Sequence, residues 1–300
     1  MAANTVHRVV CYYQTFCGLA SLLALPDPLP VTHVVVAAVH FGTNKDGSPY
    51  IHLNDEDPDS KTFDPVWAEL AELRKRGVTV TVMVGGAGGA YGVLFSDFAT
   101  YYPLLRDFLE AKQDVLQGVD LDVEETVTLP DLKMLIRRLD SDFGVEFYLT
   151  MAPMAGSLTS DGSGMGGFSY KELVSSPEGM RIDWFHGQFY GDFDAETYDA
   201  CVANGYPARQ VVMGMLSGEY SDDKSFAQAL AQVHQLAEKH GPDFGGCFVW
   251  EFSDSPPSHG KDPAAWAQAV SKALTTDSRT RKATDARCTS SSSPSFCAIL

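Results

Sequence analysis

Short apolar runs alternate with amphipathic stretches along most of the chain. Eight of these runs are rich in Val, Ile, Tyr and Phe and most are too short for helices; they predict strands at 8–14, 33–41, 78–84, 118–124, 146–152, 182–190, 210–216 and 246–252. Between the strands, apolar residues recur every three or four positions, as in 66–73 and 132–139, which predicts helices with one buried face. Eight strands, each followed by a helix, predict a single-domain α/β fold, the (β/α)8 TIM barrel, over residues 1–275.

A doubly wound open sheet would show the same alternation, usually with fewer strands. Such a sheet commonly binds a dinucleotide at a GxGxxG turn after its first strand. The glycine-rich turn at 85–89 lacks that spacing and follows the third predicted strand. We therefore expect no dinucleotide site and no cofactor.

Composition narrows the class of protein. The chain has 300 residues, of which 45% are hydrophobic and 20% charged, as in an ordinary globular protein. Its formal net charge of -17 would be repelled by phosphate backbones, which excludes nucleic acid as a partner and favours a neutral or cationic substrate. No apolar run approaches the roughly 18 residues of a membrane span.

Several features of the sequence favour a cytoplasmic location. Residues 1–8 contain no apolar stretch of the kind that secretory signals need. The six cysteines form no CxxC pair and show no metal-ligand spacing, and none of the four asparagines lies in a glycosylation sequon. We expect a cytoplasmic monomer with free thiols.

The most informative stretch is 117–124, where three acidic residues alternate with apolar ones. In a strand, Asp120, Asp122 and Glu124 share one face. Because the apolar face of a barrel strand packs under the helices, the acidic face should point inward, toward the mouth where barrel enzymes carry out their chemistry. Carboxylates stacked in one row repel each other and lose hydration, so at least one should hold a proton near neutral pH, as a general acid requires.

Two other interpretations of this stretch exist. It could be an acidic strand that faces solvent. It could also be a Mg²⁺ site, since hard cations bind clustered carboxylates. However, no phosphate-binding loop and no basic residues accompany it, so we expect no metal.

The pattern Gly-x-Asp-x-Asp-x-Glu at 118–124 resembles the signature of glycoside hydrolase family 18. Other stretches resemble motifs of the same family in the same order, over about residues 7–274: the turn at 83–86, the strand-five motif at 149–153, the strand-six motif at 188–190 and the strand-eight Trp250. More narrowly, 52–55, 118–124 and 167–170 resemble the fungal endo-β-N-acetylglucosaminidases of that family.

Three positions depart from the family pattern. Gln117 stands where the family has an Asp, and Met83 stands where it has a Ser. We expect both to weaken the buried polar support below the site. Glu125 replaces a residue that is usually aromatic and should alter the rim.

The resemblance implies a substrate-assisted mechanism, which family 18 uses in place of a carboxylate nucleophile. Glu124 would protonate the leaving oxygen and then activate water, while the 2-acetamido carbonyl of the substrate attacks the anomeric carbon to give an oxazolinium ion. Asp122 would accept the acetamide N–H, and Asp120 would hold Asp122 by sharing a proton. Tyr190 would donate its hydroxyl to the acetamide oxygen.

Three further residues would complete the site if the resemblance holds. Gln188 would lie beside Tyr190, Trp250 would form a hydrophobic floor under the sugar, and Tyr12 would close the pocket. An aromatic residue on a barrel strand is often part of the core instead, and this alternative is strongest for Tyr12.

The resemblance allows three functions. The segment 217–244 has room for a helix but not for the extra domain of many processive chitinases, and no tandem exposed tryptophans are evident. We therefore expect an endo-β-N-acetylglucosaminidase that cuts between the two GlcNAc residues of N-glycan cores. A small endochitinase is the alternative. A third candidate is an inactive chitinase-like lectin, although such lectins typically lose the catalytic Glu, which is present here as Glu124.

Residues 276–300 are rich in Ser, Thr and Arg, which predicts a disordered tail. The last four residues, from Cys297 to Leu300, match a C-a-a-X motif, whose Leu points to geranylgeranylation of Cys297. Four basic residues lie upstream, and Cys288 could carry a second lipid. We expect partial membrane association through this tail; the alternative is four ordinary residues at the end of the chain.

Overall fold

Eight parallel strands form a closed barrel in the computed structural model, which describes residues 7–275. The tail with Cys297 lies outside the described residues. The barrel closes because β1 pairs with β9 on one side and with β2 on the other. Its strands, in chain order, are β1 (Arg8–Tyr13), β2 (His33–Thr43), β4 (Thr79–Gly85), β5 (Gly118–Asp122), β6 (Tyr148–Met151), β7 (Trp184–Gln188), β8 (Val211–Leu216) and β9 (Gly246–Trp250). The predicted TIM barrel is confirmed, and each predicted strand ends within two residues of the observed one.

A ninth strand was not predicted. The strand β2 continues past the barrel, and β3 (Pro49–Leu53) folds back on it as an antiparallel hairpin. Gly47 in the turn has a φ of 88°, a conformation that glycine adopts without strain. The dipeptide Asp46-Gly47 is a hairpin signal that could have predicted this pair.

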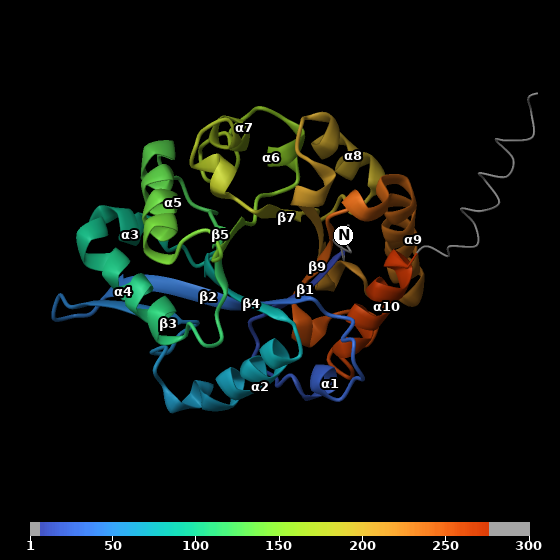
Figure 1. Cartoon of the computed structure of the whole chain (residues 1–300), viewed down its shortest axis with the longest axis horizontal. Coiled ribbons are helices and arrows are strands. Elements are labelled where there is room, and N and C mark those ends of the chain that lie inside the picture. The colour runs from blue at the N-terminus through green and yellow to red at the C-terminus, as the bar shows by residue number, and fades with distance from the viewer. Residues whose placement is uncertain (1–6, 276–300) are drawn as a thin grey trace, which may run out of the picture.

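Helices surround the barrel on all sides (Figure 1). The α-helices are α1 (Ala20–Leu23), α2 (Asp64–Lys75), α3 (Tyr91–Ser96), α4 (Phe98–Ala111), α5 (Leu129–Phe143), α6 (Gly156–Thr159), α7 (Tyr170–Val174), α8 (Ala195–Ala203), α9 (Asp223–His240) and α10 (Ala264–Leu274). Short 3₁₀ helices lie at Lys61–Phe63, Gly179–Arg181, Ala208–Gln210, Ser217–Glu219, Gly241–Asp243 and Phe252–Asp254.

The helix α5 shows why these segments are helical. Leu132, Leu135, Ile136 and Leu139 recur at the helical period and are all fully buried. Thr128 accepts the N–H of Asp131 and so caps the first turn. No α-helix among residues 7–275 is both long enough and apolar enough to cross a membrane.

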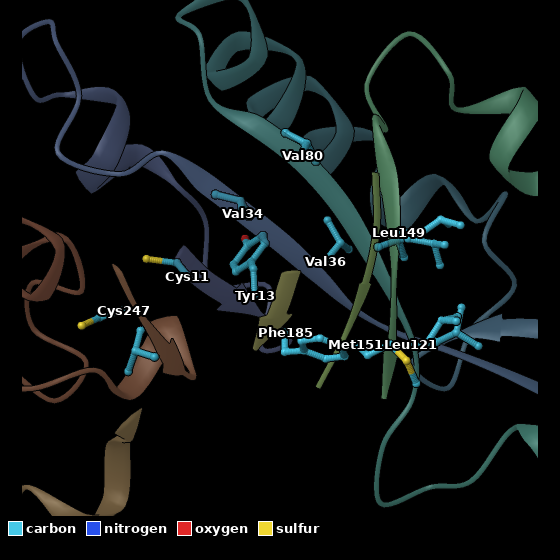
Figure 2. Packing of buried hydrophobic residues seen from close by; sticks show 14 of the residues in the cluster. Cys11, Tyr13, Val34, Val36, Val80, Leu121, Leu149, Met151, Phe185 and Cys247 are labelled. Atoms are coloured by element: carbon cyan, nitrogen blue, oxygen red, sulfur yellow. The ribbon is translucent and has the colours of Figure 1, made fainter. Parts of the chain in front are cut away.

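Side chains alternate between two apolar layers because each strand has a period of two. The outer layer fills the space between barrel and helices, and Figure 2 shows part of it, including Leu121 of β5 and Leu149 of β6. The inner layer lies inside the barrel and includes Val10, Tyr12 and Phe248. Since all eight barrel strands run in the same direction, their carboxyl ends meet at one mouth.

Candidate active site

The strand β5 places its acidic residues inside the barrel. Val119 and Leu121 belong to the outer apolar layer, so Asp120 and Asp122 point the other way. Asp120 is fully buried and Asp122 is 5% exposed. Glu124 lies two residues beyond the end of the strand and is half-buried. The row of carboxylates therefore rises from the barrel interior to its mouth.

Asp120 lies at the base of this row and is held by three donors. The hydroxyl of Tyr12 donates to Oδ2 at 2.7 Å. The hydroxyl of Thr150, the residue opposite Asp120 in the ladder between β5 and β6, donates to Oδ1 at 2.5 Å. Nδ1 of His186 lies 3.0 Å from the same oxygen. All of these side chains are at most 1% exposed, so protein groups replace water around the carboxylate.

A tryptophan fixes which ring nitrogen of His186 faces Asp120 as a donor. Nε1 of Trp184 lies 2.8 Å from Nε2 of His186. An indole N–H can only donate, so Nε2 must accept and the imidazole proton sits on Nδ1. His186 therefore faces Asp120 with the N–H at Nδ1. Burial works to raise the pKa of Asp120, but His186 first of all, and then the hydroxyls of Thr150 and Tyr12, outweigh burial and lower it, so Asp120 is an anion.

Asp122 has the opposite character. Burial raises its pKa well above the usual value, and the charges of Glu124 and Asp120 raise it further. Asp122 therefore favours its protonated form more than a free carboxyl group does, in the direction that the stacked row of carboxylates predicts. Among the contacts of residues 7–275, no hydrogen bond joins Asp120 to Asp122. The shared proton that the resemblance implies is not seen in this arrangement.

One amide connects Asp122 to Glu124. Nε2 of Gln188 lies 3.2 Å from Oδ1 of Asp122 and 3.4 Å from Oε1 of Glu124. The same nitrogen donates to the carbonyl of Ala152 at 2.8 Å, which fixes the orientation of the amide. Gln188 on β7, two strands away from β5, thus contacts both of the upper carboxylates.

These groups border a cavity of about 130 Å³ at the barrel mouth. Its lining residues are Met83, Gly86, Ala87, Asp122, Glu124, Gln188, Tyr190, Leu216 and Trp250. Burial, followed by the charges of Asp122 and Glu124, raises the pKa of Tyr190 well above its usual value, so its hydroxyl keeps its proton and can donate.

Tyr12 differs from its expected place. It does not border the cavity but lies below it, 1% exposed, with its ring centre 5.4 Å from that of Trp250. Its hydroxyl donates a hydrogen bond to Asp120. Tyr12 therefore supports the site from the core and does not close a pocket.

The glycine turn after β4 forms one wall of the cavity. Gly86 donates its N–H to the carbonyl of Asp122 at 2.9 Å, and its φ is 85°. A Cβ on Gly86 would lie 2.5 Å from Cε of Met83 and 3.4 Å from Oδ2 of Asp122. Only glycine gives this close approach without strain.

The three residues that depart from the family pattern lie in different places around the site. Met83 borders the cavity and lies beside Asp120 in the strand ladder, while His186 and Thr150 supply the buried polar support. Buried polar support below the site is therefore present, and Thr150 and His186 contribute to it. Gln117 lies before β5, where its side chain accepts the N–H of Val80 at 3.4 Å. The side chain of Glu125 turns away from the cavity toward α3.

Neither His186 nor Thr150 was predicted from the sequence as a site residue. A usable signal existed for His186, because it lies two residues before Gln188 on the same strand and so shares its inward face.

Within residues 7–275, no group of three His, Cys, Asp or Glu side chains is placed to hold a metal ion.

A (β/α)8 barrel with a buried row of carboxylates, an amide and a tyrosine around a cavity at its mouth has the architecture of a glycoside hydrolase. The chain matches no protein-family model and no curated protein sequence. Its structure is similar to that of a fungal endo-β-N-acetylglucosaminidase from glycosyl hydrolase family 18, with 34% sequence identity, a TM-score of 0.78 and coverage of 90% of this chain and 98% of that one.

Two chitinases are also similar to the chain. One from Aspergillus fumigatus has 34% identity and a TM-score of 0.74, and the alignment covers 90% of this chain and all of the other. A chitinase from Pseudoalteromonas aurantia, at 20% identity and a TM-score of 0.68 over 89% of this chain and all of that one, shows the common fold alone. The chain belongs to glycosyl hydrolase family 18, which confirms the family resemblance.

Proposed function

We propose that the chain is an endo-β-N-acetylglucosaminidase that cuts between the two GlcNAc residues of N-glycan cores with retention of configuration. The observation that carries this proposal is the convergence of Asp122, Glu124 and Tyr190 on one small cavity. The similarity to the fungal endo-β-N-acetylglucosaminidase supports it over almost the whole length of that protein.

In the proposed mechanism, one proton moves between the carboxylates of Asp122 and Glu124. In the free protein, Asp122 holds the proton, and Gln188 lies within hydrogen-bonding distance of both Asp122 and Glu124. The acetamide N–H of a bound substrate is a donor, so it favours the ionised form of Asp122 and leaves the proton to Glu124. Glu124 then protonates the leaving oxygen while the acetamide carbonyl attacks the anomeric carbon.

The oxazolinium ion formed in this step carries a positive charge next to Asp122. Tyr190 keeps its phenolic proton, so it can donate to the acetamide oxygen while that oxygen forms its bond. In the second half of the reaction Glu124 removes a proton from water, which attacks the anomeric carbon from the face that the leaving group vacated.

The surroundings of the cavity have room for a bulky substrate. A hollow of about 450 Å³ shares Gln188 and Tyr190 with the cavity, and another of about 670 Å³ is lined in part by Gly191 and Phe193. The segment between β8 and β9 holds the helix α9 and short 3₁₀ turns, without an inserted domain. This open approach suits a branched glycan better than a deep tunnel would.

Crystalline chitin would need a row of exposed aromatic side chains, on which successive sugars stack. The large hydrophobic side chains that are exposed among residues 7–275 are Val145, Met165 and Met180, none of which is aromatic. Cleavage of soluble chitin oligomers is the second candidate function, favoured by the equal identity to the chitinase from Aspergillus fumigatus.

A direct competition tests the proposal. The protein is incubated with a labelled N-glycopeptide and with chitin oligomers, and the products are identified by mass spectrometry. We expect a peptide that retains one GlcNAc, and slower or absent cleavage of the oligomers. Glu124→Gln should lose at least about 100-fold in rate, while Glu172→Gln, an exposed carboxylate on α7, should not. Rapid cleavage of the oligomers with an intact glycopeptide would favour the chitinase.

A further inference from the structure

Two adjacent glutamates at the end of β5 point in different directions. Glu124 borders the cavity, whereas the carboxylate of Glu125 accepts three backbone N–H groups at the start of α3. Oε1 accepts from Ala90 and, at 2.5 Å, from Tyr91, and Oε2 accepts from Gly92 at 3.0 Å. Glu125 therefore links the segment that carries Glu124 to a different part of the barrel mouth.

The carboxylate of Glu125 fits closely against the start of α3. No side chain within the α3 segment caps this helix. Its first N–H groups instead donate to Glu125, which lies 34 positions after Tyr91 in the chain. A Cβ on Gly92 would lie 2.9 Å from Oε2 of Glu125, and one on Gly89 would lie 3.3 Å from Oε1. A charged carboxylate makes stronger hydrogen bonds to backbone N–H groups than a neutral acceptor does. The close fit and the negative charge of Glu125 therefore both strengthen this contact.

The segment that Glu125 holds begins at the wall of the cavity. Gly86 and Ala87 border the cavity, and residues 88 and 89 join them to the start of α3. The other end of this turn is fixed by the hydrogen bond from Gly86 to the carbonyl of Asp122. Nδ1 of His40 on β2 lies 2.7 Å from the carbonyl of Gly89, so β2 also contacts the turn.

We propose that Glu125 is a positioning residue for Glu124. Its hydrogen bonds fix the backbone that follows Glu124 against the glycine turn, and so set the distance between the carboxylate of Glu124 and the cavity wall at Gly86. The inference rests on the proposed function of Glu124 as the general acid. The proposal assigns a function to Glu125, which stands where the family usually has an aromatic residue.

The test compares Glu125→Gln with two other variants. The glutamine keeps the shape but loses the charge, and its NH₂ group cannot accept an N–H. Gly92→Ala disturbs the same contact from the other side, because its new Cβ would crowd Oε2. The matched control is Asp222→Asn, which removes the charge of an exposed cap on α9 that does not border the cavity.

With the natural glycan, kcat should fall between about 10- and 100-fold in both Glu125→Gln and Gly92→Ala, with KM within a few-fold of the parent, because a misplaced catalytic group affects the transition state. Asp222→Asn should keep the parent kcat. A second substrate, an aryl glycoside of the same glycan, has a leaving group that departs without protonation. The release of phenol in the first turnover should therefore be close to the parent rate in all variants.

Each other outcome contradicts the inference. An unchanged kcat in Glu125→Gln would show that the contact does not position Glu124. A loss of equal size with both substrates, together with a lower Tm than in Asp222→Asn, would show a helix cap with no separate effect on the acid. A parent protein that cleaves neither substrate would overturn the proposed function and this inference with it.

Discussion

The hydrogen-bonded chain below the cavity makes a quantitative prediction for His186→Phe. The phenylalanine fills a similar volume but offers no donor and no acceptor. Asp120 loses one of its three donors, and the indole N–H of Trp184 loses its acceptor. Both groups are buried, at 0% and 3% exposure, so water does not replace the lost partner.

The magnitude follows from these two groups. A buried polar group left without its partner costs about 1–3 kcal/mol, and more when it is charged, so the two together should cost about 2–6 kcal/mol. For a domain somewhat above about 250 residues, each kcal/mol lowers Tm by about 2–4 °C, which gives a fall of roughly 4–24 °C.

The effect should also depend on pH. The folded-state pKa of Asp120 is lowered, so its contribution to stability is present above the unfolded pKa of about 3.9 and is lost as the pH falls through the folded value. Removing a donor raises that folded pKa and shrinks the contribution. The difference in stability between the parent and His186→Phe should therefore be large at pH 7 and narrow below about pH 4.

Thermal unfolding followed by circular dichroism at several pH values measures both effects. The control is His234→Phe, on an exposed part of α9, which should change stability by less than about 0.5 kcal/mol. If His186→Phe and the parent unfold at the same temperature at pH 7, the described hydrogen bonds do not carry the stability assigned to them. A difference that stays constant down to pH 3 would refute the assignment of Asp120 as an anion.

Three further predictions concern other parts of the chain. Asp122→Asn should raise Tm increasingly as the pH rises above about 4, because the raised folded pKa of Asp122 makes its ionisation costly in the folded state, and thermal melts over pH 4–8 that show no such gain would contradict this. Gly86→Ala should cost about 1–2 kcal/mol of backbone strain and lower kcat/KM by displacing Met83 into the cavity, and wild-type kinetics would contradict the close approach. The lipidation of Cys297 stays a prediction: expressed in eukaryotic cells with Leu300 as the last residue, the chain should gain the mass of a geranylgeranyl group, and Cys297→Ser should not, whereas an unmodified Cys297 would contradict it.

The sequence by itself determined the barrel strands and the inward direction of the acidic row. Both depend on local patterns, because apolar runs mark strands and the period of two assigns Asp120 and Asp122 to one face whatever their neighbours are. The hairpin of β3 was also within reach through the turn at Gly47, but a lone strand outside the eightfold alternation has no place in the barrel pattern.

Only the tertiary structure decided what touches the carboxylates. The register of β5 against β6 places Thr150 opposite Asp120, and closure of the barrel brings Tyr12 from β1 across to the same side chain. The side chain of Glu125 reaches α3 only because the turns after β4 and β5 meet at one mouth. These contacts join residues 30 to 108 positions apart, and no local pattern encodes the register and closure that bring them together.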